Sequence, residues 1–142
     1  MAAPVGSSAY DTLHMTVVQD RNLFPIIDKA VSGMIFNMLG KRMDKSFGAP
    51  TMVFVSSKPA MMPGMEYANA ACALENMAIA ATSLGVASII WGGAAAAVAQ
   101  DDSLRKKLEI PEDYNPLLCI SLGYAQEEEP AKKHEIEINR VL

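Results

Sequence analysis

The segment from Met65 to Ala94 constrains the fold more than any other part of the chain. Between Glu66 and Leu84 it has no glycine or proline and is rich in alanine and unbranched residues. This composition predicts a helix about 28 Å long. Apolar residues occupy nearly every side of this predicted helix. Helices with this pattern are normally buried, either inside a domain or between subunits.

A glycine turn and a short apolar run follow the predicted helix. Gly85 stands where a helix C′ residue needs positive φ. Residues 86–91 (VASIIW) are mostly apolar and β-branched, and they predict a buried strand that ends at Gly92 and Gly93. A buried helix, a tight turn and a buried strand in direct succession indicate an α/β chain.

Composition sets the outer limits of the interpretation. The chain has 142 residues, of which 51% are hydrophobic and 20% charged. It is therefore expected to form one domain over residues 1–142 with a substantial core. The net charge of −4 gives no electrostatic reason to bind nucleic acid or an anionic membrane. The apolar run 76–99 is interrupted by glycines, so it predicts helix plus strand rather than a membrane span. Cys72 and Cys119 are expected to be free thiols in a reducing, cytoplasmic setting.

The rest of the chain alternates strand and helix patterns. Apolar residues at helical spacing predict a helix over residues 23–39, with Asn22 as its N-cap and Gly40 as its stop. Further strands are predicted at residues 13–18, 51–56 and 117–123, of which residues 51–56 are apolar enough to be central in the sheet.

Three shorter segments complete the prediction. Residues 94–99 favour a short helix, and Asp101 or Asp102 is expected to cap another that ends at Leu108. Residues 135–141 alternate polar and apolar side chains, which suits either an edge strand or a terminal arm that extends over a partner.

A search for catalytic groups finds little. His14 and His134 have no carboxylate at a spacing that supports catalysis, and there is no zinc motif, nucleophile elbow or P-loop. Gly92 and Gly93 could let backbone amides approach a flat or anionic ligand, although such a pair is often only a turn. No catalytic side chain and no metal site are therefore predicted.

Two polar features remain open. Asn69, Cys72 and Asn76 fall on one stripe of the predicted long helix, where a buried Asn must bond to backbone, water or a partner. Lys132 and Lys133 form a small basic cluster with His134, which could meet a phosphate or could simply be a solvated tail.

In the order of its pieces, nearly the whole chain resembles the nitroreductase family of flavoproteins. The matching features are the Ala3-Pro4 loop, the Ala49-Pro50 strand opening, the segment LENMAIAATSLGVASIIWGG, the Leu-Gly-Tyr strand end at residues 122–124, and Pro130-Ala131-Lys132-Lys133. The resemblance implies an α+β fold, with a sheet flanked by helices and a long buried central helix, that assembles as an intertwined homodimer. It also implies FMN at the dimer interface, NADH or NADPH as reductant, and nitro compounds, quinones or similar small molecules as electron acceptors.

The resemblance further implies a set of cofactor-binding residues. Ser7 and Ser8 would approach the flavin, and Lys132 or Lys133 would approach its phosphate. Ile90, Trp91, Gly92 and Gly93 would line the isoalloxazine ring, with a backbone N–H near its N5. The protein would place the ring and tune it, while the hydride chemistry belongs to the cofactor.

One departure from the family pattern leads to a second hypothesis, and a third has a separate basis. Family members usually carry an Arg-Arg-Ser-x-Arg type of cluster before the N-terminal loop, and this sequence, which opens at Met1-Ala2-Ala3-Pro4, has no counterpart. The chain is therefore expected to be N-terminally short, and the second hypothesis is a non-catalytic dimeric relic or small-ligand-binding protein with weak or no FMN binding. The third is a regulatory or interaction module built on the alanine-rich helix.

Overall fold

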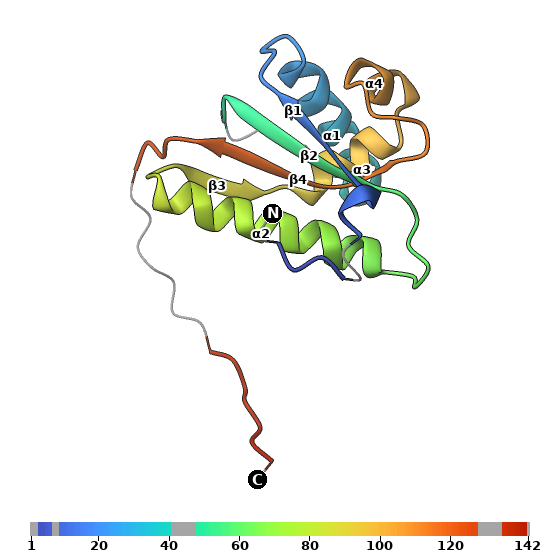
Figure 1. The fold of residues 1–142 in the computed structure, drawn as a ribbon. Coiled ribbons are helices and arrows are strands. Elements are labelled where there is room, and N and C mark those ends of the chain that lie inside the picture. The colour runs from blue at the N-terminus through green and yellow to red at the C-terminus, as the bar shows by residue number, and fades with distance from the viewer. Residues whose placement is uncertain (1–2, 7–8, 41–47, 128–134, 142) are drawn as a thin grey trace.

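The computed structural model describes residues 3–6, 9–40, 48–127 and 135–141, and its centre is a four-stranded antiparallel sheet (Figure 1). The spatial order of the strands is β1-β2-β4-β3. Their bounds are Leu13–Val18 for β1, Thr51–Ser57 for β2, Ala87–Ile90 for β3 and Asn115–Gly123 for β4. The two apolar strands β2 and β4 are interior, as predicted for residues 51–56.

Helices cover both faces of the sheet and make three layers. The long helix α2 (Met65–Ser83) lies along one face, and α1 (Phe24–Leu39), α3 (Gly92–Ala99) and α4 (Asp102–Lys107) lie against the other (Figure 1). This arrangement confirms the predicted α+β sheet flanked by helices. Within the described part of the chain, no helix is both long enough and apolar enough to cross a membrane.

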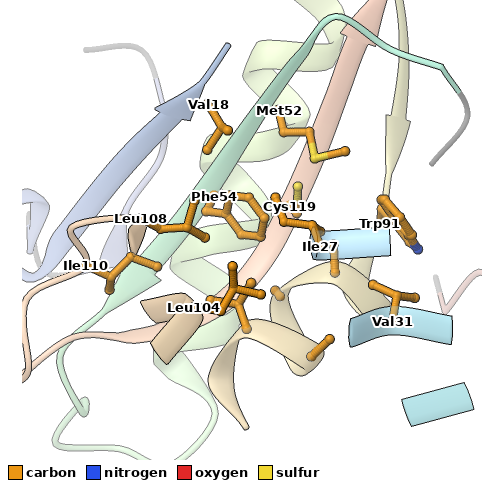
Figure 2. Close-up of a cluster of buried hydrophobic side chains, with 14 residues drawn as sticks. Val18, Ile27, Val31, Met52, Phe54, Trp91, Leu104, Leu108, Ile110 and Cys119 are labelled. Atoms are coloured by element: carbon orange, nitrogen blue, oxygen red, sulfur yellow. The ribbon is translucent and has the colours of Figure 1, made fainter. Parts of the chain in front are cut away.

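The alternation of side chains along β2 separates two hydrophobic cores. Met52 and Phe54, both without exposed surface, join a cluster with α1, α3 and α4, which Figure 2 shows around Phe54. Val53 and Val55 point to the opposite face and pack with Leu74 of α2. Period-two alternation in a strand that is buried on both faces is what places one core on each side of the sheet.

The predicted C-terminal stops of the helices agree with the structure more often than the predicted N-caps do. Gly40 has a φ of 65° and Gly85 has a φ of 70°, so both are left-handed stops as predicted. Asn22 does not cap α1, because its backbone N–H and its Nδ2 both donate to Asp20 Oδ1 at 2.9 Å in a local turn. For α4 the prediction is confirmed, since Asp101 Oδ1 accepts the Leu104 N–H at 3.0 Å.

The segment after α2 differs from its prediction. The pattern of residues 86–91 predicts a buried strand, yet all four residues of β3 are exposed in the single chain. Among the described strands, β3 pairs only with β4, so it forms an edge of the sheet. Gly92 and Gly93 do not follow the strand as a loop; they form the first turn of α3.

Of the two C-terminal alternatives, the structure excludes the edge strand, and an arm that extends over a partner stays a prediction. Residues 135–141 are not part of the sheet, so the edge-strand prediction is wrong. They are exposed and lead away from the body of the molecule, as a terminal arm would (Figure 1).

Candidate cofactor site at the junction of β3 and α3

The junction between β3 and α3 brings four predicted site residues together, Ile90 to Gly93. Ile90, the last residue of β3, keeps 50% of its surface exposed, and Gly92 is exposed at the start of α3. A Cβ built on Gly92 would meet no atom within 4 Å, so a ligand can approach this main chain closely.

The start of α3 offers hydrogen-bond donors. The first N–H groups of a helix have no intrahelical acceptor and carry partial positive charge. Here the Ala94 N–H turns back to the Trp91 carbonyl at 3.2 Å. The N–H groups of Gly92 and Gly93 lie before it, outside the helical ladder. Such donors suit an electron-rich or anionic ring edge.

Trp91 anchors the junction through core packing of its side chain and a hydrogen bond of its backbone. Its side chain is 7% exposed and belongs to the core cluster, beside Val31 of α1 (Figure 2). Its backbone N–H donates to the Cys119 carbonyl of β4 at 2.7 Å. A Cβ on Gly93 would lie 3.3 Å from Trp91 Nε1, so the indole is folded back over the helix start. The structure therefore places the Trp91 ring in the core and leaves its main chain next to the exposed Gly92.

The N-terminal loop packs against α2 and is hydrogen-bonded to it. Ser7 and Ser8 lie outside the described residues, but the residues before and after them are described. Gly6 N–H donates to Asn69 Oδ1 of α2 at 2.9 Å, and the Tyr10 hydroxyl donates to the Ala3 carbonyl at 2.7 Å. Ala3 and Val5 pack against Ala73 of α2. The sequence pattern left backbone, water or a partner open for Asn69; the structure shows a backbone donor, that of Gly6.

Three other groups bear on the chemistry of the chain: the two predicted lysines, the side-chain types that bind metals and the buried thiol of Cys119. Lys132 and Lys133 lie outside the described residues. Among the residues that are described, no three His, Cys, Asp or Glu side chains group closely enough to hold a metal ion. Cys119 is a free thiol in the core, and burial raises its pKa to about 12, so it does not supply a thiolate.

An exposed apolar surface adjoins the junction. On its inner side α2 buries Asn69, Ala70, Ala73, Leu74 and Ala81. Away from this buried side, Tyr67 and Ile79 keep 53% and 60% of their surface exposed. Neighbouring β3 adds Ile90, whose partner across the sheet, Ile120, packs in the core on the α2 side. We call Tyr67, Ile79 and Ile90 the α2–β3 surface. Exposed apolar groups on two packed elements are typical of an interaction surface.

The sequence and the fold match one family. The chain belongs to the nitroreductase family, whose model matches residues 6–124. Membership in this family supports an oxidoreductase activity.

Solved structures of similar proteins agree with the family. The chain is similar to a nitroreductase with bound FMN from Bacteroides fragilis, with 27% identity, a TM-score of 0.77, and coverage of 99% of this chain and 80% of that one. It is also similar to a putative NADH dehydrogenase/NAD(P)H nitroreductase from Bacteroides thetaiotaomicron, with 25% identity, a TM-score of 0.67, and coverage of 99% and 79%.

A more distant structure shares the fold alone. It is the NADPH:FMN oxidoreductase from Vibrio harveyi complexed with NAD+, with 14% identity, a TM-score of 0.71, and coverage of 99% of this chain and 65% of that one. Among curated proteins, none matches the chain.

Proposed function

We propose that the chain is an FMN-dependent oxidoreductase that takes electrons from NADH or NADPH and passes them to nitro compounds, quinones or similar acceptors. The observation that carries this proposal is the junction of β3 and α3, where the exposed Ile90 ends the strand and Gly92 and Gly93 provide the first two N–H groups of the helix. A similar protein with the same fold over 99% of this chain has FMN bound. The Bacteroides thetaiotaomicron protein, whose name includes NADH and NAD(P)H, supports the choice of reductant.

The residues at the junction fit a flavin ring. Ile90 offers an apolar contact to a flat ring, and Gly92, which has no Cβ, lets the ring approach the main chain. The N–H groups at the start of the eight-residue helix α3 would donate to the ring edge and stabilise negative charge that develops there. Bound FMN would supply the hydride transfer itself. The chain's own part is to bind, orient and hydrogen-bond the ring, which agrees with the lack of an ionisable group suited to catalysis among the described residues of the site.

The two ends of the cofactor are assigned by the same proposal. Ser7 and Ser8, in the loop held on α2, would approach the flavin, and Lys132 or Lys133 would pair with its phosphate. A lysine ammonium pairs with phosphate as a point charge, so this contact should weaken as ionic strength rises.

The proposed working form is a homodimer in which residues 1–142 form one domain of each subunit. The α2–β3 surface is the proposed interface, because it is apolar and adjoins the junction, so a second copy would close one side of the site. The exposed Ile136, Ile138 and Val141 of the terminal arm would then pack on the partner. Free Cys72 and Cys119 suit the reducing cytoplasm as the place of action.

The proposal is tested by flavin titration followed by reduction. FMN is added to the protein and binding is followed by flavin fluorescence, with riboflavin as a control that lacks the phosphate. The loaded protein is then mixed anaerobically with NADH or NADPH, and afterwards with a nitro compound or quinone. Binding of one FMN per chain, bleaching by a nicotinamide and recovery with the acceptor support the proposal. Failure to bind FMN refutes it, and binding without bleaching by either nicotinamide refutes the assigned reductants.

A further inference from the structure

The N-terminal loop is tied to the body of the molecule at two separated points. At one point, Gly6 N–H donates to Asn69 Oδ1 at 2.9 Å. At the other, the Lys58 N–H donates to the Thr12 carbonyl at 3.0 Å and the Tyr114 hydroxyl donates to the Asp11 carbonyl at 3.2 Å. The first tie comes from α2 and the second from the loops next to β2 and β4. Ser7 and Ser8 lie between the two ties in sequence.

The Asn69 tie is built into the fold. The Asn69 side chain is 5% exposed, and its acceptor is directed at a main-chain donor 63 residues away in sequence. A Cβ on Gly6 would lie 3.2 Å from Met65 Sδ and 3.4 Å from Asn69 Oδ1, so the loop backbone rests directly on the helix. The Gly6 carbonyl in turn accepts the Ala9 N–H at 3.2 Å, which ties together the chain on either side of the two serines.

The contrast with Asn76 shows that this is not a general property of asparagine on α2. Asn76 lies two turns further along the helix, and its Nδ2 donates to the Cys72 carbonyl of the same helix at 2.9 Å. That bond is local and reaches no other element. Of these two asparagines, Asn69 is the one that links α2 to the loop.

From this geometry we propose that Asn69 is a positioning residue, which fixes Gly6 and thereby sets the loop in the shape that flavin binding requires. The inference rests on the proposed function. Without the Oδ1 acceptor, the Gly6 N–H loses its partner in a partly buried setting, and the loop gains conformations that do not bind the cofactor. The bound shape then has to be selected from a broader population, which weakens affinity rather than abolishing it.

The test compares three variants with the wild-type chain. Asn69→Leu removes the acceptor while keeping a side chain branched at Cγ, and Asn69→Asp keeps an oxygen at the same position. Asn76→Leu is the matched control, because it makes the same change on the same helix without touching the loop. Amide hydrogen exchange at Gly6 is measured in the FMN-free protein, and the FMN dissociation constant is measured at the same pH and ionic strength.

We expect Asn69→Leu to lose about tenfold in Gly6 protection and about tenfold in FMN affinity, a factor that corresponds to about 1.4 kcal/mol. Asn69→Asp and Asn76→Leu should stay within about twofold of wild type in both. The inference is overturned if Gly6 protection survives in Asn69→Leu, or if FMN affinity falls equally in Asn76→Leu. If wild-type protein binds no FMN, the proposed function fails, and Gly6 exchange alone then decides whether Asn69 anchors the loop.

Discussion

The most informative substitution on the α2–β3 surface is Ile79→Glu. Complete burial of an isoleucine side chain is worth about 1.5–3 kcal/mol. Ile79 keeps 60% of its surface exposed in the single chain. Burying this exposed part in an interface is therefore worth about 1–2 kcal/mol per chain. A two-fold interface contains the residue twice, so the dimer should lose about 2–4 kcal/mol, which weakens association by about 30- to 900-fold. The cost of covering a new carboxylate adds to this figure.

The assay is sedimentation velocity over a dilution series, with the free energy of unfolding of each variant measured in parallel. Met38→Glu is the matched control, because Met38 is 72% exposed and lies on α1 in the opposite layer. We expect Ile79→Glu to shift the protein to monomer while Met38→Glu leaves the dimer unchanged. Equal association of Ile79→Glu and wild type would refute the assignment of this face as the interface.

Three further outcomes follow from the described contacts. Gly92→Ala should leave the melting temperature at or above that of wild type, because its Cβ meets nothing within 4 Å. FMN binding by this variant should nevertheless weaken by about 5- to 150-fold, because the methyl occupies the proposed ring surface. Asp101→Ala removes the cap to Leu104. This change should cost about 1 kcal/mol, a drop of about 2–4 °C in melting temperature, while Asp101→Asn should retain most of the stability. Burial raises the pKa of Cys119 from 9.0 to about 12, so the unfolded chain releases this proton first. Urea denaturation should therefore show stability falling between those pH values by up to about 1.4 kcal/mol per pH unit. Cys119→Ala should lack that part of the slope.

Much of the fold could be predicted because its signals are local. Gly40 and Gly85 stop helices through a backbone conformation that glycine adopts without strain, and this depends on no distant contact. The apolar run of β2 likewise identifies a strand that is covered on both sides. The N-cap of α4 was predictable because Asp101 bonds three residues ahead.

The predictions fail where a residue's burial or position depends on an element far away in the sequence. β3 resembles a buried strand in sequence, but its place at the edge of the sheet follows from the strand order, which no local pattern encodes. The predicted strand at residues 117–123 starts two residues late, because β4 already includes Asn115 and Pro116, where the pairing with β2 shifts register. Proline is tolerated at strand ends and register shifts, and on the other side β3 pairs with β4 only from Ile120 onwards.

The candidate site was predictable only in part. Ile90 to Gly93 do lie together at an exposed junction, but the burial of the Trp91 ring depends on its packing with Val31 of α1. The partner of Asn69 was beyond pattern reasoning for the same cause, since Gly6 is 63 residues away. The available signal was a polar residue, Asn69, on an otherwise apolar helix. It indicated that the side chain forms a hydrogen bond but did not identify the partner.

The claim at the centre of this account is that the flavin is held where two copies of the chain meet. Sedimentation of the FMN-loaded protein, followed at the visible absorbance of the flavin, tests it most directly. We expect flavin and protein to sediment together as a species of twice the 15.3 kDa chain mass, with one flavin per chain. Flavin that sediments as free cofactor, or with a species of single-chain mass, would contradict the account.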